Sequence, residues 1–114
     1  MASISVQRRA GSEYLAVGSS AGGVKPFETI RLLAQGFVPG VLVEFRIPSI
    51  GFVQSARALT GNAWVDTLAP GYEGNFEISA EGRTNLIPII GMFTEETVRG
   101  FKEIVDGKHD ALPE

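Results

Sequence analysis

The sequence predicts an all-β fold, a sandwich of about seven strands with one short C-terminal helix. Three observations predict it. Fourteen glycines and six prolines are spread along 114 residues and leave no low-complexity block. Between them lie runs of about four to eight residues in which apolar and polar side chains alternate, the spacing typical of sandwiches and barrels. Only the last part of the chain repeats its apolar residues at helical spacing.

The N-terminal region, residues 1–23, has two open interpretations. Ile4 and Val6 alternate with polar neighbours, and a second short apolar run extends from Tyr14 to Val17. Gly18 to Gly23 then forms a glycine-rich loop. These residues are either edge strands of the domain or an arm that docks on another subunit. In the second case Arg8 and Arg9 would anchor the arm on an acidic partner surface.

The clearest strand pattern lies between residues 30 and 47. It consists of two alternating runs, separated by a turn from Gly36 to Gly40 in which Phe37 is an apolar anchor. One side of each run is expected to face the core, because successive side chains of a strand point to opposite faces. The residues on that side are Ile30, Leu32, Ala34, Val41, Val43, Phe45 and Ile47.

Four further strands are expected before residue 93. They cover residues 52–59, 63–68, 72–80 and 85–92, with a hairpin turn over residues 81–83. The third should bury Phe76, Ile78 and Ala80. The last contains Pro88, and proline cannot donate to a strand ladder. We therefore expect this strand at a sheet edge or with a bulge.

The C-terminal residues predict a short amphipathic helix over residues 93–107. Thr94 is a good N-cap, and Glu95 and Glu96 would lie in the first turn, where the helix dipole favours acids. Val98 and Phe101 continue the apolar spacing. Residues 108–114, which include the single histidine, His109, are expected to form a flexible tail.

Composition excludes several classes of function. Thirteen acidic residues against ten basic ones give a net charge of −3, whereas nucleic-acid-binding domains carry a basic excess. The absence of cysteine excludes a disulfide scaffold, a thiolate zinc site and a cysteine nucleophile. No nucleophile–base pair, metal set or phosphate loop is recognisable. We therefore expect no enzymatic activity, no cofactor and no nucleic-acid partner.

Neither a membrane span nor an export signal is expected. No window approaches the ~20 apolar residues that cross a bilayer. Arg8 and Arg9 are followed by Ala-Gly-Ser-Glu rather than by the apolar core of a secretion signal. The chain is therefore expected to be made in the cytoplasm and to have no membrane partner.

The stretch from Pro26 to Met92 resembles a bacterial and phage immunoglobulin-like module. The resemblance rests on ordered short motifs, including Pro26-Phe-Glu-Thr29, Gly36-Phe-Val-Pro-Gly40, Gly61-Asn-Ala-Trp64 and Glu81-Gly-Arg-Thr84. It implies an immunoglobulin-like sandwich over residues 24–92. Such a core needs a buried aromatic residue, so Trp64 is either that residue or a surface contact. The C-terminal helix and the single copy depart from the family pattern.

The resemblance and the missing export signal together suggest a bacteriophage virion component. Small immunoglobulin-like proteins without signal peptides are typical of tailed phages, as capsid decoration (cement) or tail accessory proteins. The expected mechanism is docking on subunits of the same assembly, either copies of itself or a capsid or tail protein. The expected location is the virion, with the cytoplasm or cell surface as alternatives. A carbohydrate- or cell-surface-binding module using Trp64 and Tyr72, with weak glycan contacts, is the alternative function.

Apolar content supports docking. The chain is 44% hydrophobic and 20% charged, below the usual ~25% charged residues. Leu33 and Val65 are among the apolar residues assigned to the outward side, which needs a cover. The interface candidates are Arg8, Arg9, Tyr14, Leu15, Leu42, Trp64, Tyr72, Ile87, Ile89 and Phe101.

Overall fold

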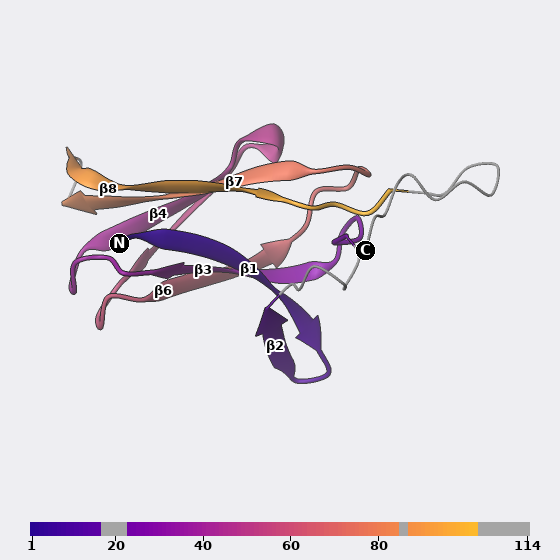
Figure 1. Cartoon of the computed structure of the whole chain (residues 1–114), viewed down its shortest axis with the longest axis horizontal. Coiled ribbons are helices and arrows are strands. Elements are labelled where there is room, and N and C mark those ends of the chain that lie inside the picture. Colours follow the sequence, from indigo (N-terminus) through magenta and orange to yellow (C-terminus); the bar gives the residue numbers. More distant parts are fainter. Residues whose placement is uncertain (17–22, 85–86, 103–114) are drawn as a thin grey trace.

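In the computed structural model, residues 1–16, 23–84 and 87–102 are described, with the side chains of residues 10, 15 and 16 excepted. Over this part the chain forms two antiparallel sheets of four strands, seen as two layers in Figure 1. The first has the order β2-β1-β3-β6 and the second β5-β4-β7-β8. Their bounds are β1 Ser3–Ala10, β2 Glu13–Ala16, β3 Thr29–Gln35, β4 Leu42–Ile47, β5 Phe52–Arg57, β6 Ala63–Leu68, β7 Phe76–Thr84 and β8 Ile87–Val98, with a 3-10 turn at Pro48–Ile50.

The core lies between the sheets and follows the alternation of the strands. Ile30, Leu32 and Ala34 of β3 face Val43, Phe45 and Ile47 of β4, and all six are fully buried. Phe76, Ile78 and Ala80 of β7 are buried as predicted. Val41 is only partly buried, at the margin of the core.

The outward assignment of Val65 is wrong. The side chain of Val65 is buried, and that of Trp64 beside it is half exposed. Val65 pairs with Leu32, and the two residues share the inner face. The interpretation of Trp64 as the buried aromatic of the core is therefore wrong as well, and Phe45 fills the centre instead.

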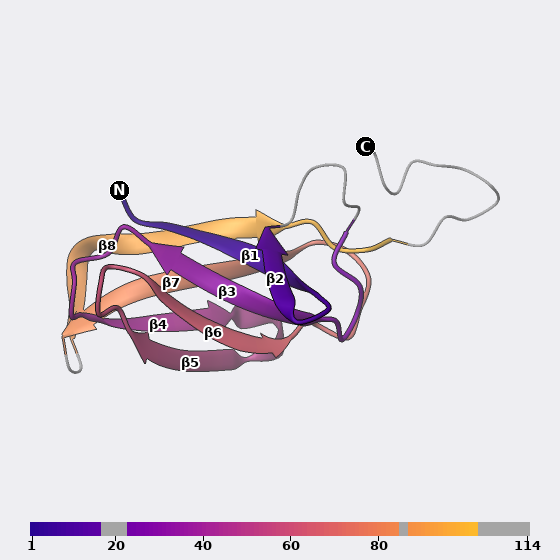
Figure 2. The same ribbon diagram turned by 90° about the horizontal axis from the view of Figure 1, so that it is seen from below.

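The N-terminal residues form part of the first sheet. β1 lies between β2 and β3, and its Ile4 and Val6 are buried in the core. β2 is the edge strand and folds back on β1 as a hairpin. The hairpin projects from the sandwich in Figure 1 and lies in front of the first sheet in the view of Figure 2. The loop predicted before residue 23 lies largely outside the described residues.

The predicted helix over residues 93–107 is wrong where the structure describes it. Thr94 to Val98 continue β8 and pair with β7, with Glu95 opposite Ser79 and Glu96 opposite Ile78. The N-cap and acidic first turn are local preferences of a few tenths to about 1 kcal/mol, which a full set of strand pairings outweighs. Phe101 is not helical, and residues 103–107 lie outside the described part.

The hairpin predicted at residues 81–83 is also misplaced, because β7 continues to Thr84. Glu81 pairs with Phe93 and Arg83 with Pro88, so residues 89–92 of β8 stand opposite Gly82 alone. This is a β-bulge with several extra residues in an edge strand, and it fits the prediction made from Pro88. Gly91 supplies the required positive φ of 84°.

A seam of backbone hydrogen bonds joins three distant segments beyond the end of β8. Val24 forms a parallel bridge with Gly100. Its N–H donates to Arg99 O at 2.9 Å, and its carbonyl accepts from Phe101 N at 2.8 Å. Gly74 N donates to Phe101 O at 2.7 Å. A Cβ on Gly100 would overlap the Gly74 carbonyl, so only glycine fits this crossing.

Candidate functional site

The outer face of the first sheet carries a cluster of two aromatic and two charged side chains, from here on the Arg31 cluster: Tyr14, Arg31, Trp64 and Asp66. Arg31 of β3 stands directly opposite Asp66 of β6, and Trp64 lies two residues before Asp66 on the same face. Tyr14 comes from β2, where it pairs with Arg9. The strand order thus brings together four residues that are far apart in the sequence.

The Arg31 guanidinium is the centre of the cluster. Its Nε donates to Asp66 Oδ1 at 2.7 Å and its Nη2 to Asp66 Oδ2 at 3.1 Å, a two-pronged pair. Its Cζ lies 4.0 Å from the centroid of the Tyr14 ring and 3.7 Å from that of the Trp64 ring. Cation–π contact with both rings and the ion pair hold the guanidinium in one orientation.

The ion pair lowers the pKa of Asp66 and raises the pKa of Arg31. The hydrogen bond from Arg31 lowers the pKa of Asp66 and outweighs the desolvation that raises it. Smaller lowering contributions come from the Arg31 charge, the Tyr14 hydroxyl and the charge of Arg9. The hydrogen bond to Asp66 raises the pKa of Arg31. Both groups are therefore ionised at neutral pH, and Arg9 adds a second positive charge to the face.

The sequence identified the two rings of this cluster but not its charged centre. Tyr14 and Trp64 were candidates because of their chemistry, and the structure places both against Arg31. Arg31 and Asp66 were missed, because a single strand shows which residues face outward but not which strands are neighbours. The only available signal was a polar residue on the outward side of each strand.

Two other N-terminal candidates have contacts within the chain. Arg8 Nε donates to Glu28 Oε2 at 2.9 Å, and its Nη2 donates to Glu28 Oε1 and to Gly23 O, both at 3.0 Å. Arg9 Nε donates to Gly11 O at 3.0 Å in the hairpin turn. The Leu15 side chain lies outside the described part. Arg8 thus ties β1 to the segment before β3.

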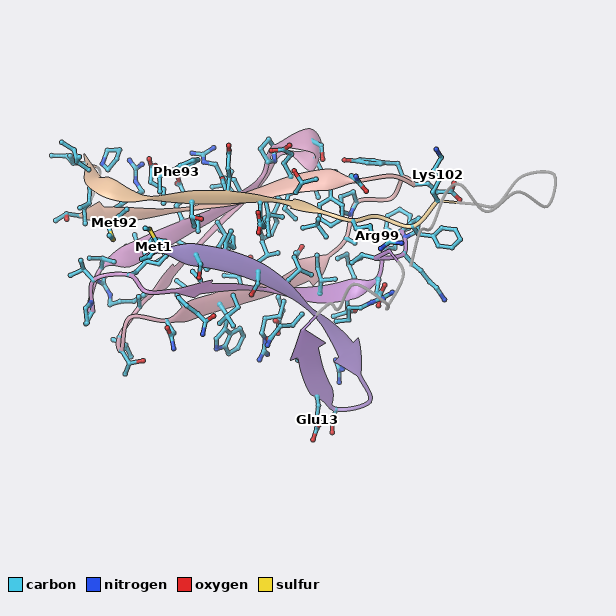
Figure 3. The ribbon with its side chains drawn as sticks, viewed as in Figure 1. Met1, Glu13, Met92, Phe93, Arg99 and Lys102 are labelled. Carbon is cyan, nitrogen blue, oxygen red and sulfur yellow. The ribbon has the colours of Figure 1, made fainter. Side chains whose placement is uncertain are left out.

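Large apolar side chains are exposed on β8, and we call Ile87, Ile90 and Phe93 the β8 apolar strip. Their exposed fractions are 70%, 99% and 54%. Phe93 and Met92 point to opposite sides of the strand in Figure 3, and Met92 packs on the core. The strip includes the predicted Ile87. Ile90 was missed because the bulge changes the alternation, and Phe93 because it was assigned to the start of the predicted helix.

The remaining candidates are dispersed. Ile89 and Leu42 are partly buried. The Tyr72 hydroxyl is hydrogen-bonded to Ser49 Oγ at 2.6 Å beside the 3-10 turn, so Tyr72 belongs to that end of the sandwich rather than to the Arg31 cluster. Phe101 is partly buried, and its backbone belongs to the seam with Val24.

A shallow pocket of about 310 Å³ lies at the end of the second sheet, between residues 39–42, Arg57 and residues 83–84. Arg57 Nη1 donates to Gly40 O at 2.8 Å, and Arg83 Nη1 donates to Glu81 Oε1 at 2.9 Å. Both guanidinium groups are thus engaged by the chain itself. The described residues of the lining include no carboxylate or imidazole that could act as a base.

Residues 1–16, 23–84 and 87–102 contain no group of three His, Cys, Asp or Glu side chains placed to hold a metal ion. In the same part of the chain, no helix is long and apolar enough to cross a membrane.

No protein-family model matches the chain, and no solved structure matches it significantly. Function must therefore be argued from the surfaces described above.

Proposed function

We propose that this chain is a non-enzymatic structural protein of a large assembly, a bacteriophage virion component of the capsid-decoration or tail-accessory type, which acts by docking on neighbouring subunits. The observation that carries the proposal is the β8 apolar strip. Ile90, at 99% exposure, has no packing partner among the described residues. Large exposed apolar side chains close together in a chain are typical of protein interaction sites, and the three side chains of the strip lie within a seven-residue stretch of β8.

The bulge is consistent with a docking role for the strip. Edge strands are open to unwanted pairing with other chains, and bulges block such pairing. Here the bulge interrupts the ladder at residues 89–92 while directing Ile90 outward. At residues 89–92 the strand therefore offers side chains to a partner rather than a regular ladder edge. Burying such side chains contributes about 25 cal/mol per Å², repeated over every copy in a shell or tail.

An immunoglobulin-like arrangement is part of this proposal, and its support is the strand order. Without β2, the first sheet has the order β1-β3-β6 and the second β5-β4-β7-β8. In immunoglobulin sandwiches the first, second and fifth strands share one sheet, and the third, sixth and seventh share the other. β1, β3 and β6 then correspond to the first group, and β4, β7 and β8 to the second. β5 departs from the constant-domain pattern, because it pairs with β4 rather than β6.

The carbohydrate-binding alternative has weaker support. A sugar platform needs free aromatic faces, but the Arg31 guanidinium already lies over the rings of Tyr14 and Trp64. Tyr72, the second ring of that alternative, is hydrogen-bonded to Ser49 at another part of the surface.

The proposal is tested by following the protein through a density gradient of a lysate from its native source. We expect it to migrate with large particles at high copy number. Migration only as a free, slowly sedimenting protein would contradict the proposal, and glycan binding would be tested next.

A matched pair of variants tests the role of the strip. Ile90→Ser should shift most of the protein from the particle fractions to the free fraction, because it removes the most exposed apolar side chain of the strip. Val53→Ser on β5, also an exposed edge-strand position, should leave the distribution unchanged. Both variants should unfold at the same temperature as the wild type. Equal retention of both variants in particles would show that the strip is not part of the docking surface.

A further inference from the structure

We propose that the Arg31 cluster is a second docking site, which takes a carboxylate-bearing segment of a partner protein. The inference rests on the proposed docking function and adds the chemistry of one partner contact. The cluster lies on the first sheet, whereas the β8 apolar strip belongs to the second. The two sites can therefore be tested separately.

The residue types and their rigidity suit an interface centre. Tryptophan, tyrosine and arginine are the residues most enriched where a few side chains supply most of the binding energy. Here all three are in contact before any partner arrives. Trp64 remains half exposed, and Arg31 is partly exposed. Little side-chain freedom would be lost on binding, which favours affinity.

The donors of Arg31 indicate which group a partner would supply. A guanidinium has five N–H donors. Asp66 takes one from Nε and one from Nη2, and Nη1 donates to no acceptor among the described residues. The edge formed by Nη1 and the second Nη2 hydrogen can donate two parallel hydrogen bonds. A carboxylate is the side-chain group that matches this fork.

Charge on this face favours an acidic partner. Arg9 and Arg31 stand against Asp66, an excess of one positive charge in a chain whose net charge is −3. Glu13, at the tip of the β1–β2 hairpin, points away from the sandwich (Figure 3). Asp66 neutralises part of the Arg31 charge, so a single contact would be weak. Many copies on one particle would compensate through multivalency.

The test is a titration followed by ¹H–¹⁵N NMR, with an acetylated and amidated glutamate tripeptide as the probe. Trp64 is the only tryptophan, so the protein has one indole N–H signal, and this signal lies in the site. We expect a saturable shift of the indole and Arg31 Nε–H signals, half complete at about 1 mM peptide or below. The glutamine tripeptide, which lacks the carboxylates, should give no saturable shift.

Variants separate the fork from general charge. Arg31→Gln, followed through the indole and the β3 and β6 amides, should weaken binding by about tenfold or more, since charge-assisted hydrogen bonds are lost. Arg31→Lys keeps the charge but lacks the fork, and it should also weaken binding. Arg46→Gln, an exposed arginine of the second sheet, is the matched control and should bind like the wild type. The amide signals of buried β3 residues verify that each variant is folded.

Three outcomes of the peptide titrations would overturn the inference: no saturable shift, equal affinity for both tripeptides, or unchanged affinity in Arg31→Gln. Indole shifts that follow protein concentration without peptide would also overturn it, because a second copy would then occupy the site. Particle association in the gradient without peptide binding would reject this inference and leave the proposed function standing. Peptide binding by a protein that sediments only as a free species would support the carboxylate site and reject the proposed function.

Discussion

Glu28 and Asp66 are each held by the fork of one arginine, but in different surroundings. The Arg8–Glu28 pair is largely shielded and ties β1 to the segment before β3. Glu28 also accepts from the backbone N–H of Lys25 at 2.8 Å. The Arg31–Asp66 pair lies on the open face, where solvent weakens ion pairs. We therefore expect the first pair to matter for stability and the second for recognition.

Glu28 predicts a specific acid sensitivity. Desolvation raises the pKa of Glu28, but the hydrogen bonds from Arg8 and Lys25 and their charges together lower it below its ordinary value of 4.5. A lowered pKa means that the folded state favours the ionised form. The stabilisation is therefore complete above about pH 4.5, the unfolded value, and is lost as the pH falls through the lower, folded value.

Glu28→Gln should lower the free energy of unfolding by about 1 kcal/mol at pH 7 and flatten its decline below pH 4.5. Urea denaturation at several pH values measures both effects. Glu95→Gln, at an exposed carboxyl of β8, serves as the control and should change little at pH 7. An acid decline in Glu28→Gln as steep as that of the wild type would contradict the assignment.

At the scale of elements, alternation predicted the strands whose two faces differ. β3 and β4 were predicted with the correct buried side, because Ile30, Leu32, Phe45 and Ile47 alternate with polar residues. β8 was divided into a strand and a helix, because Thr94 and the two glutamates after it imitate a helix start. In the structure these residues pair with β7 as a strand. Such pairing depends on residues that are distant in the sequence.

The candidate sites were predictable only as residue types. Trp64 and Tyr14 could be selected from their chemistry, whereas their meeting at Arg31 depends on the order β2-β1-β3-β6. No local pattern encodes that order. The exposure of Ile90 depends in turn on a bulge, in which Gly91 has a positive φ. Pro88 predicted an irregularity there but not its length.

The seam beyond β8 gives a prediction for an element junction. Gly100→Ala places a Cβ against the Gly74 carbonyl, and the Gly100 carbonyl is itself in close approach to Gly23. The crossing backbones must separate, and we expect a loss of about 2 kcal/mol or more in the free energy of unfolding. Lys102→Ala, an exposed position two residues later, should change it by less than about 0.5 kcal/mol. Equal thermal unfolding of the two variants would show that the seam is dispensable.

At the scale of the whole molecule, the first strand is part of the core rather than an addition to it. β1 lies inside its sheet, and Ile4 and Val6 fill the space between the layers. Removal of residues 1–16 would expose one edge of β3 and empty part of the core. We therefore expect this truncation to abolish the cooperative thermal transition.

Point variants test the same expectation without truncation. Ile4→Ala should cost about 2–5 kcal/mol, the usual range for a buried large-to-small change. Ser5→Ala, the exposed neighbour on the same strand, should cost less than about 0.5 kcal/mol. Calorimetry distinguishes these results. A truncated protein that still melts cooperatively would identify the N-terminal residues as a detachable arm.

The opposite placement of the first strand's start and the last strand's end has a mechanical consequence. Ser3 pairs with Gln35 at the end of β3. β8 ends at Val98, two residues before Gly100, which bridges Val24 in the segment ahead of β3. In Figure 1, β1 starts toward the left side of the sandwich, and β8 runs away from that side toward the right. A force applied between them would pull β1 along β3 and β8 along β7. Because antiparallel hydrogen bonds run perpendicular to the strands, the ladders would be loaded in shear, and many bonds would have to break together. Such a strand arrangement suits a protein that must resist tension.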